Sequence, residues 1–170
     1  MKRCDARAAG SLYRHLAVLI LLAITVVAAA AWSFMGGLQP ATPCTGGDIS
    51  SCKGTARCLS GTVTHIVDGD TLDVDGQRIR LTLVNTPETG DPGYQEAKDF
   101  TASTCPVGSR ALVDEDDGQT GGSYGRIIAV VYCGATILNA ALLQSGYAVI
   151  LTQYCSVSEF ASEPWATACG

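Results

Sequence analysis

The 170-residue sequence has little charge, and basic residues are the scarcer kind: 16% of its residues are charged, with eleven Lys and Arg against sixteen Asp and Glu. Internal repeats with a period of about 20–50 residues are absent, which excludes solenoid and collagen-like architectures. Only one stretch is long and apolar enough to span a bilayer, which excludes a polytopic membrane protein. Apolar residues make up 47% of the chain and exclude disorder throughout. The length predicts one domain of ordinary size with appendages.

The apolar stretch predicts an N-terminal targeting helix. Residues 16–34 carry no charge, four basic residues precede them, and no basic residue follows until Lys53. A basic flank before an apolar run places the N-terminus in the cytoplasm and the rest of the chain outside. The small residues 28–31 suit a signal peptidase, whereas the run is also close to the roughly 20 residues that span hydrocarbon. Residues 1–35 therefore form a signal peptide or a membrane anchor, and the protein is secreted or held at the cell surface.

Seven of the eight cysteines follow this segment and would meet an oxidising compartment, where disulfides persist. The first three of the seven show no C-x-x-C spacing, which argues against a zinc knuckle. Connectivity does not follow from sequence; one arrangement pairs Cys105 with Cys133 and Cys155 with Cys169. The odd number leaves one thiol free or paired between chains.

Residues 36–58 are rich in Gly, Pro, Ser and Thr and predict a linker, which leaves residues 59–170 as the folded domain. Asp75-Gly76, between two runs of alternating apolar residues, is a strong signal for a hairpin. The predicted strands cover residues 61–67, 71–74, 77–84, 110–113, 126–132 and 147–151, and the predicted helices cover 94–103 and 138–145.

The order of these elements predicts a mainly β fold with two to three short helices (α+β). The first three strands are hairpin-linked, which argues against a doubly wound parallel sheet. Five short strands interrupted by a helix are typical of a small, partly open barrel of the oligonucleotide/oligosaccharide-binding (OB) type.

Acidic and basic side chains gather at the predicted strand ends. Asp70 lies in the turn between the first two strands, Arg80 on the third, Asn85 and Glu88 just after it, and Arg126 at the start of a buried strand. Hard divalent cations prefer carboxylate, amide and carbonyl oxygens. Two arginines can recognise a phosphate, and a glutamate can take a proton from water. Together these groups suit in-line attack on a phosphodiester.

Four motifs carry a resemblance to a known family: VDGDT (67–71), RLTLVNTPE (80–88), YGR (124–126) and LNAALLQSGYA (138–148). Their order and spacing resemble the staphylococcal nuclease (thermonuclease) family over about residues 61–154. The resemblance implies the same five-stranded barrel and a Ca²⁺-dependent nuclease acting on DNA and RNA. It also implies roles for nine residues. These are Asp70, Asn85 and the Thr86 carbonyl as calcium ligands with Asp68 behind them, Glu88 as general base, Arg80 and Arg126 at the phosphate, and Tyr124 and Tyr154 at the nucleotide.

The sequence departs from the family's pattern at three positions. Asn85 stands where a second calcium-ligand aspartate is expected, so the site loses a negative charge and we expect weaker calcium binding. Ser123 replaces a lysine expected before Tyr124. Thr152 falls where a tyrosine near the nucleotide is expected, and Tyr154 follows two residues later.

The charge balance is unusual for a protein that binds polyanions. From Leu59 onward there are five basic residues against fourteen acidic ones, which repels nucleic acid at long range. We therefore expect binding to be local, through calcium and two arginines, and to favour single-stranded or short DNA and RNA. The acidic run of residues 114–117 predicts a solvated loop between strands, with a second metal site as the alternative.

Two other functions stay open. A barrel that binds oligonucleotides without cutting them would fit Asn85 and the acidic surface, but it would have no need of Glu88 as a base. A disulfide-stabilised envelope protein without either activity would explain the cysteines, but not the acidic and basic residues that converge at the strand ends. No protein partner is implied, and contact with a membrane would come through residues 1–35 if they are not cleaved.

Overall fold

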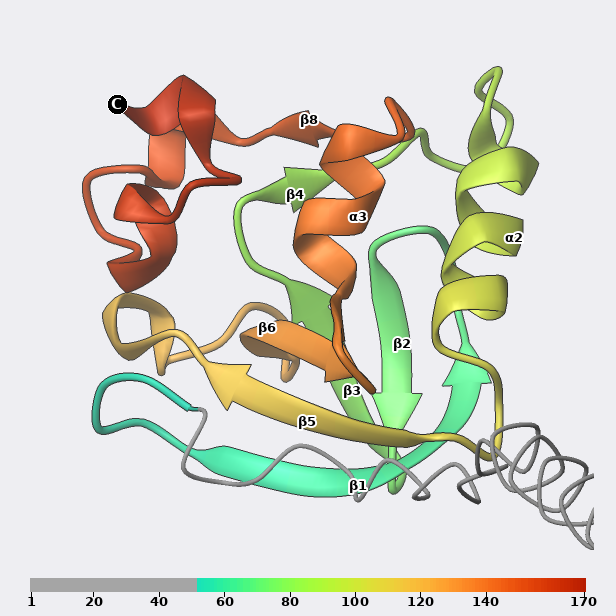
Figure 1. Ribbon diagram of the computed structural model, residues 1–170, viewed down its shortest axis with the longest axis horizontal. Helices are drawn as coiled ribbons and strands as arrows, with labels where there is room; N and C mark the ends of the chain where they lie inside the picture. Colours follow the sequence, from blue (N-terminus) through green and yellow to red (C-terminus); the bar gives the residue numbers. More distant parts are fainter. Residues whose placement is uncertain (1–51) are drawn as a thin grey trace, which may run out of the picture. The chain divides into compact units, whose positions relative to one another are not determined.

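Residues 52–170 are the part of the chain that the structure, a computed structural model, describes (Figure 1). The targeting helix expected over residues 1–35, most of the linker, and two cysteines, Cys4 and Cys44, lie outside these residues. Within the described part, the helices are too short or too polar to cross a bilayer.

Five strands close into a barrel, as the sequence predicts. Neighbours in the order β3-β2-β1-β5-β6 are antiparallel, and β3 closes the barrel by pairing in parallel with β6. Asp75 and Gly76 form the tight turn of the β2–β3 hairpin, with φ of 47° and 77°. The barrel strands are β1 (Cys58–Ile66), β2 (Thr71–Val74), β3 (Gln77–Leu81), β5 (Arg110–Glu115) and β6 (Ile127–Cys133).

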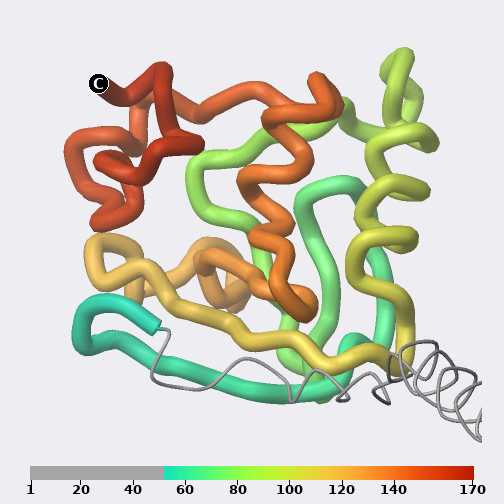
Figure 2. Tube along the Cα trace, viewed as in Figure 1, coloured from blue at the N-terminus to red at the C-terminus, as the bar shows by residue number. Residues whose placement is uncertain are grey.

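The remaining elements are short. Strand β7 (Thr136–Ile137) extends the sheet beyond β6, while β4 (Val84–Asn85) and β8 (Val149–Ile150) form a separate two-stranded pair. Two α-helices, α2 (Tyr94–Thr104) and α3 (Leu138–Gln144), lie side by side (Figure 2) and contact each other. The ring centroids of Phe100 and Tyr147 are 5.1 Å apart. Four 3₁₀ turns complete the described chain: η2 (Asp117–Gln119), η3 (Thr152–Tyr154), η4 (Glu159–Ser162) and η5 (Thr167–Cys169).

Strand β6 is buried on both faces, as its continuous apolar sequence predicts. Alternate side chains, Ile127, Ala129 and Val131 among them, belong to the main apolar cluster of the barrel. Val130 belongs to a second cluster with Phe160 and Trp165 of the C-terminal segment. The C-terminal 3₁₀ turns therefore pack against the outside of the barrel through these aromatic residues.

The predicted strand over residues 77–84 is wrong in its second half, because the chain turns away after Leu81. Leu83 has a φ of 60° and is buried, so the backbone cannot continue the strand there. The Asn139 side chain of α3 holds this turn, since its Nδ2 donates to the Thr82 carbonyl over 2.9 Å. The turn sends β4 to pair with β8 and leads the chain on toward Asp70, whose carboxylate accepts from the Thr86 amide.

Three disulfides tie the described elements together. Cys105–Cys133 joins the end of α2 to β6, and Cys155–Cys169 closes the C-terminal segment. Both pairs are those the sequence analysis put forward. A third disulfide joins Cys52 to Cys58, the first residue of β1, and closes the short loop that precedes this strand.

The prediction of a solvated loop over residues 114–117 is wrong. Asp114, Glu115 and Asp116 are at most 2% exposed. They are buried because neighbouring segments supply hydrogen-bond donors. Asp116, for example, accepts from the hydroxyls of Thr82 and Ser158 and from three nitrogens. Buried carboxylates are tolerated when such partners satisfy them.

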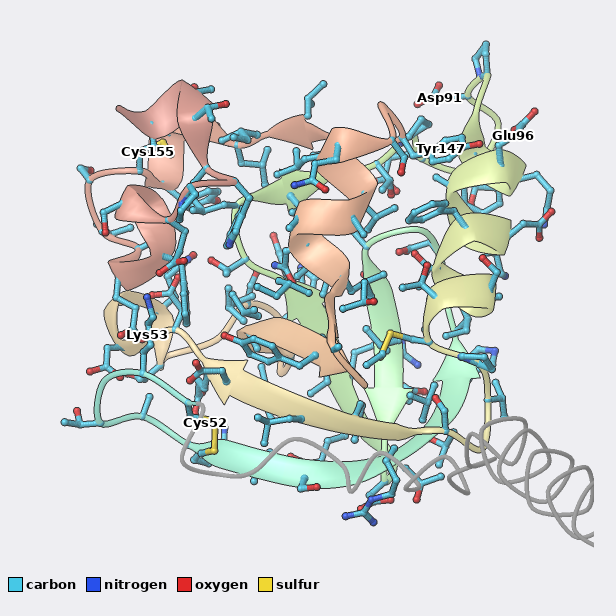
Figure 3. All side chains as sticks on the ribbon, in the orientation of Figure 1. Cys52, Lys53, Asp91, Glu96, Tyr147 and Cys155 are labelled. Carbon is cyan, nitrogen blue, oxygen red and sulfur yellow. A yellow bond between two sulfur atoms is a disulfide. The ribbon has the colours of Figure 1, made fainter. Side chains whose placement is uncertain are left out.

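Residues 52–57, assigned to the linker in the sequence analysis, are bound to this acidic run. Figure 3 labels Cys52 and Lys53 at the start of this segment. Lys53 donates its backbone N–H to Asp114 over 2.9 Å and pairs through its ammonium with Glu163. The Arg57 guanidinium forms a bidentate ion pair with Glu115, in which Nε and Nη2 donate to the two carboxylate oxygens over 2.8 and 3.2 Å. Asp117 accepts the backbone N–H groups of residues 55 and 56. The acidic run thus holds the chain that leads into the barrel.

Asp114 makes the stability of the fold depend on pH. Burial raises its pKa to about 6 from an ordinary value of 3.8, and the charges of Glu159 and Asp117 act in the same direction, whereas Lys53 opposes them. The folded state therefore binds this proton more tightly than the unfolded chain does. Its contribution to stability is full below pH 3.8 and is lost as the pH rises toward 6.

We expect Asp114→Asn to remove this dependence, because the amide oxygen can still accept from Lys53 but carries no charge. The wild type loses the contribution of Asp114 between pH 4 and pH 7, and the variant does not. The difference in free energy of unfolding, variant minus wild type, should therefore increase by about 1–2 kcal/mol over that range. Urea unfolding across that range measures it, with Asp99→Asn on the exposed face of α2 as control. Parallel pH curves for Asp114→Asn and the wild type would contradict the prediction.

Candidate active site

Asp70 lies at the centre of the predicted site, buried in the turn between β1 and β2. Its Oδ2 accepts from the Thr86 amide over 2.8 Å and lies 3.0 Å from the Arg80 Nη2, while its Oδ1 accepts from the Thr71 hydroxyl. Asp68 braces the turn from behind, since its carboxylate accepts the backbone N–H of Asp70 over 3.1 Å. The structure thus brings these predicted residues together.

The positive charge around Asp70 does not fully compensate the burial of its carboxylate. Its pKa is raised to about 6, chiefly by burial and also by the neighbouring charge of Asp68, against the opposite effects of Arg80 and the hydrogen bonds from Thr86 and Thr71. Because the net shift is upward, Arg80 does not offset the full cost of burying this carboxylate. A further cation beside Asp70 would stabilise its ionised form.

Arg80 projects from the end of β3 and is held on all sides. Its Nη1 donates to the carbonyls of Leu81 and Val84, and its Nη2 lies within 3.2 Å of both Asp70 and the Asn85 amide oxygen. Burial lowers the pKa of the Arg80 guanidinium, and the charge of Arg126 acts in the same direction. Since the guanidinium donates three hydrogen bonds to protein oxygens and is ion-paired with Asp70, Arg80 supplies a fixed positive charge more than free donors.

Arg126 is the less restrained arginine. Its Nε and Nη2 donate to the Ser123 carbonyl and hydroxyl over 3.0 and 3.2 Å, which leaves three of its five N–H groups without a partner in residues 52–170. Ser123 and Arg126 close a tight turn with Tyr124 and Gly125, both at positive φ. Tyr124 is 98% exposed, and its ring centroid lies 5.7 Å from the Arg126 guanidinium.

A pocket of about 110 Å³ opens beside the two arginines. Tyr154, 41% exposed, contributes to its wall, whereas Tyr124 stands outside it. The apolar part of the lining comes from Leu81 and Leu83 before β4, Ile128 on β6 and Leu151 after β8. Gln119 and Thr82 add polar atoms. The full lining is Arg80, Leu81, Thr82, Leu83, Gln119, Ser123, Arg126, Ile128, Leu151 and Tyr154.

Glu88 lies in the exposed loop after β4. Its backbone N–H donates to the Asp91 side chain and its carbonyl accepts from the Asp91 N–H, which fixes the loop. Its carboxylate accepts no hydrogen bond from the described residues, yet its charge acts on Arg80. Glu88 therefore presents its carboxylate to solvent, close enough to Arg80 for the two charges to interact.

The donor set around Asp70 fits a hard cation with few charged ligands. No group of three or more His, Cys, Asp or Glu side chains within residues 52–170 is arranged to hold a metal. What is present is one buried carboxylate with a raised pKa, the Asn85 amide oxygen and the Thr86 carbonyl. Calcium accepts such mixed oxygen ligands, completed by water, and its affinity is lower when fewer of the ligands are carboxylates.

Several residues that shape the site were not predicted to belong to it, although Ser123 was noted as a departure from the family's pattern. Thr82, Gln119 and Ser123 line the pocket, and Asn139 holds the turn that precedes β4. Asn139 falls within the motif at residues 138–148, but a single sequence does not show which of its residues reaches across to β3. Gln119 follows the acidic run, where nothing in the pattern marks it as part of a pocket.

The chain matches the family model described as "Staphylococcal nuclease homologue" over residues 78–164. It is 36% identical over 102 residues to an uncharacterized protein of Bacillus anthracis, covering 54% of this chain and 47% of that one. It is 36% identical over 96 residues to the thermonuclease of Staphylococcus hyicus, covering 51% and 56%. Endonuclease YncB of Bacillus subtilis is 28% identical over 111 residues, covering 60% and 53%. The chain thus spans about half the length of these curated relatives.

Proposed function

Because the chain belongs to the staphylococcal nuclease family, we propose that it is a calcium-dependent nuclease that hydrolyses phosphodiester bonds of DNA and RNA outside the cytoplasm. The observation that supports the proposal is that Arg80 pairs with Asp70, lies within the electrostatic influence of Glu88 and Arg126, and lines a pocket together with Arg126. The nuclease names of the relatives support the same activity.

In the proposed reaction each residue has a separate task. Arg126 directs its free N–H groups at the phosphate, and Arg80 adds positive charge where negative charge develops on the phosphate oxygens. Glu88 takes a proton from the attacking water. Asp70, Asn85 and the Thr86 carbonyl would hold calcium. When bound, calcium would supply positive charge to the phosphate and make a coordinated water more acidic.

The acidic surface supports single-stranded or short substrates. Within residues 52–170, Lys53, Arg57, Arg78 and Arg80 are each paired with a carboxylate. Few cations remain to attract a long duplex from a distance. Export, by cleavage or by anchoring of residues 1–35, follows from the basic flank and apolar run and stays a proposal.

We expect the affinity for single-stranded oligonucleotides to depend only weakly on salt. If two arginines neutralise two phosphates, log K should fall with log [salt] with a slope of about −1.4. Fluorescence anisotropy with labelled oligonucleotides in millimolar calcium, using the Glu88→Gln variant to prevent cleavage, measures this slope. A slope steeper than about −3 would show that a wider basic surface takes part.

We expect Asn85→Asp to tighten calcium binding by about tenfold, because a carboxylate replaces a neutral ligand. The added carboxylate can keep the contact that the amide oxygen makes with Arg80. Isothermal titration calorimetry with calcium measures the change. Gln77→Glu, which adds the same charge at an exposed position at the start of β3, controls for net charge. Equal gains in both variants would place the calcium away from Asn85.

The full, oxidised chain tests the proposal directly on single-stranded DNA and RNA, with millimolar calcium and with chelator. Cleavage that needs calcium supports the nuclease. An oligonucleotide-binding module without catalysis is the second candidate, favoured by the amide at Asn85 and its contact with Arg80. Binding without cleavage, at any calcium concentration, would favour that module. Recovery of cleavage in Asn85→Asp would then locate the defect at the metal site.

A further inference from the structure

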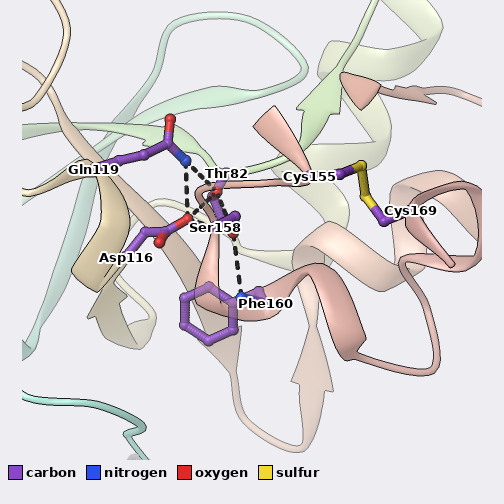
Figure 4. The surroundings of a disulfide bond; sticks show 7 residues. All are labelled: Thr82, Asp116, Gln119, Cys155, Ser158, Phe160 and Cys169. Atoms are coloured by element: carbon purple, nitrogen blue, oxygen red, sulfur yellow. Dashed lines mark hydrogen bonds between the residues drawn. A yellow bond between two sulfur atoms is a disulfide. The ribbon is translucent and has the colours of Figure 1, made fainter. Parts of the chain in front are cut away.

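Gln119 is a polar side chain of the pocket that the proposed reaction does not use. It stands at the end of η2 and lines the pocket together with Arg80 and Arg126. Its Nε2 donates to Asp116 Oδ2 over 2.9 Å and to the Thr82 hydroxyl oxygen over 3.0 Å (Figure 4). The side chain is therefore fixed from behind by two hydrogen bonds.

The surroundings determine which way the Gln119 amide faces. The Thr82 hydroxyl donates its own proton to Asp116 over 2.6 Å, so toward Gln119 its oxygen can only accept. The Asp116 carboxylate oxygen is an acceptor as well. Only the amide NH₂ can face both groups. The Oε1 must then face away from them, as Figure 4 shows, and it accepts no hydrogen bond from residues 52–170.

The support behind Gln119 is rigid. Asp116 is fully buried, and the Ser158 hydroxyl and the backbone N–H groups of Gly118 and Glu159 donate to it too. A network in which every partner is satisfied restricts the positions of its members. The Gln119 carbonyl is thus an acceptor held in place before any ligand arrives, which lowers the entropy cost of using it.

The pocket around this acceptor has the character of a nucleoside site. Two arginines line it together with Leu83, Ile128, Leu151 and Tyr154, which supply apolar surface. A nucleotide has the same combination of a charged phosphate and a flat, largely apolar base. A fixed carbonyl among these groups favours a nucleoside that places a donor opposite it and disfavours one that leaves it unpaired.

We propose that Gln119 is a specificity-determining residue: its fixed carbonyl accepts a hydrogen bond from a donor on the nucleoside whose phosphate the two arginines hold. The donor is a ribose hydroxyl or a base N–H. The inference rests on the proposed function, because it requires the pocket to bind a nucleotide.

The test compares substrate preferences in two variants. Gln119→Met keeps the length of the side chain and removes its carbonyl. Ser158→Ala removes a different hydrogen bond to Asp116 and leaves Gln119 and the pocket lining intact. For each protein, kcat/KM is measured on ribo- and deoxyribo-oligonucleotides of one sequence and on oligonucleotides that differ in a single base at the cleaved position.

We expect Gln119→Met to reduce one of the two preferences by about fivefold, the effect of one hydrogen bond, and Ser158→Ala to leave both preferences as in the wild type. Loss of the ribose preference identifies a hydroxyl donor, and loss of the base preference identifies a base N–H. Preferences that Gln119→Met leaves within twofold of the wild type overturn the inference, as does a wild type with no preference at all.

Binding separates this inference from the proposed function. Dissociation constants of the same oligonucleotides in calcium, measured by anisotropy with Glu88→Gln added to each protein that cleaves, give the preference ratios without cleavage. A wild type that binds but does not cut overturns the proposed hydrolysis, while the ratios still decide on Gln119. A wild type that cuts with preferences unaffected by Gln119→Met overturns the role of Gln119 and leaves the hydrolysis in place.

Discussion

Glu88→Gln is expected to lower kcat by about 10²–10⁴-fold, the usual contribution of a general base. Glutamine keeps the size of the side chain but cannot take a proton from water. The fold should be unaffected, because Glu88 is exposed and holds its loop only through backbone hydrogen bonds with Asp91. Calcium and oligonucleotide affinities should also change little, since the side chain makes no other contact among the described residues.

Steady-state cleavage of a single-stranded oligonucleotide across a range of pH measures the effect of Glu88→Gln. The rise of kcat with pH on the acid side, which reports deprotonation of the base, should disappear. Glu96→Gln is the matched control, an exposed glutamate in the first turn of α2 (Figure 3). Activity within a few-fold of the wild type would assign the proton transfer to another group or the cleavage to a contaminant.

Arg126→Lys is expected to lower kcat by about 10²–10³-fold, with a smaller effect on KM. A lysine keeps the positive charge but not the planar set of donors that can contact two phosphate oxygens at once. Arg126 suits this test better than Arg80, which is held by Asp70 and by the carbonyls that follow it. Removing Arg80 would leave a buried carboxylate unpaired and destabilise the fold.

The control for Arg126→Lys is Arg110→Lys, an exposed arginine whose contact is the Ser60 hydroxyl on β1. Both variants lose one guanidinium and keep their charge, so only a local role at the phosphate separates them. Thermal unfolding should place both within a few degrees of the wild type. Similar losses of activity in the two variants would indicate a general effect of surface charge.

The barrel was predictable because its determinants are local. The alternating residues around Asp75-Gly76 specify a hairpin, and the unbroken apolar run of β6 specifies a strand with two buried faces. The departure at Leu83 was not predictable, because its neighbours have the same apolar character as a continuing strand. Its cause is the Asn139 side chain, 56 residues further along the chain, which binds the Thr82 carbonyl.

The burial of residues 114–116 was missed for a related reason. Four consecutive acidic residues suggest solvent, and nothing local shows that Arg57 or Ser158 will supply the donors they need. At the site, the motifs brought Asp70 and Arg80 together correctly. They did not show that Arg80 would donate hydrogen bonds to the carbonyls of Leu81 and Val84. Backbone carbonyls are present at every residue, so a pattern of side chains cannot reveal which of them an arginine will bind.

The Asp116–Ser158 contact has a consequence for when activity can arise. The pocket is lined by residues from Arg80 to Tyr154, and the carboxylate behind Gln119 also accepts from the Ser158 hydroxyl. A polypeptide that emerges N-terminus first therefore cannot complete the pocket until Tyr154 has followed the barrel strands. Protein able to bind a nucleotide there would accordingly appear only once the barrel and the segment after β8 are both present.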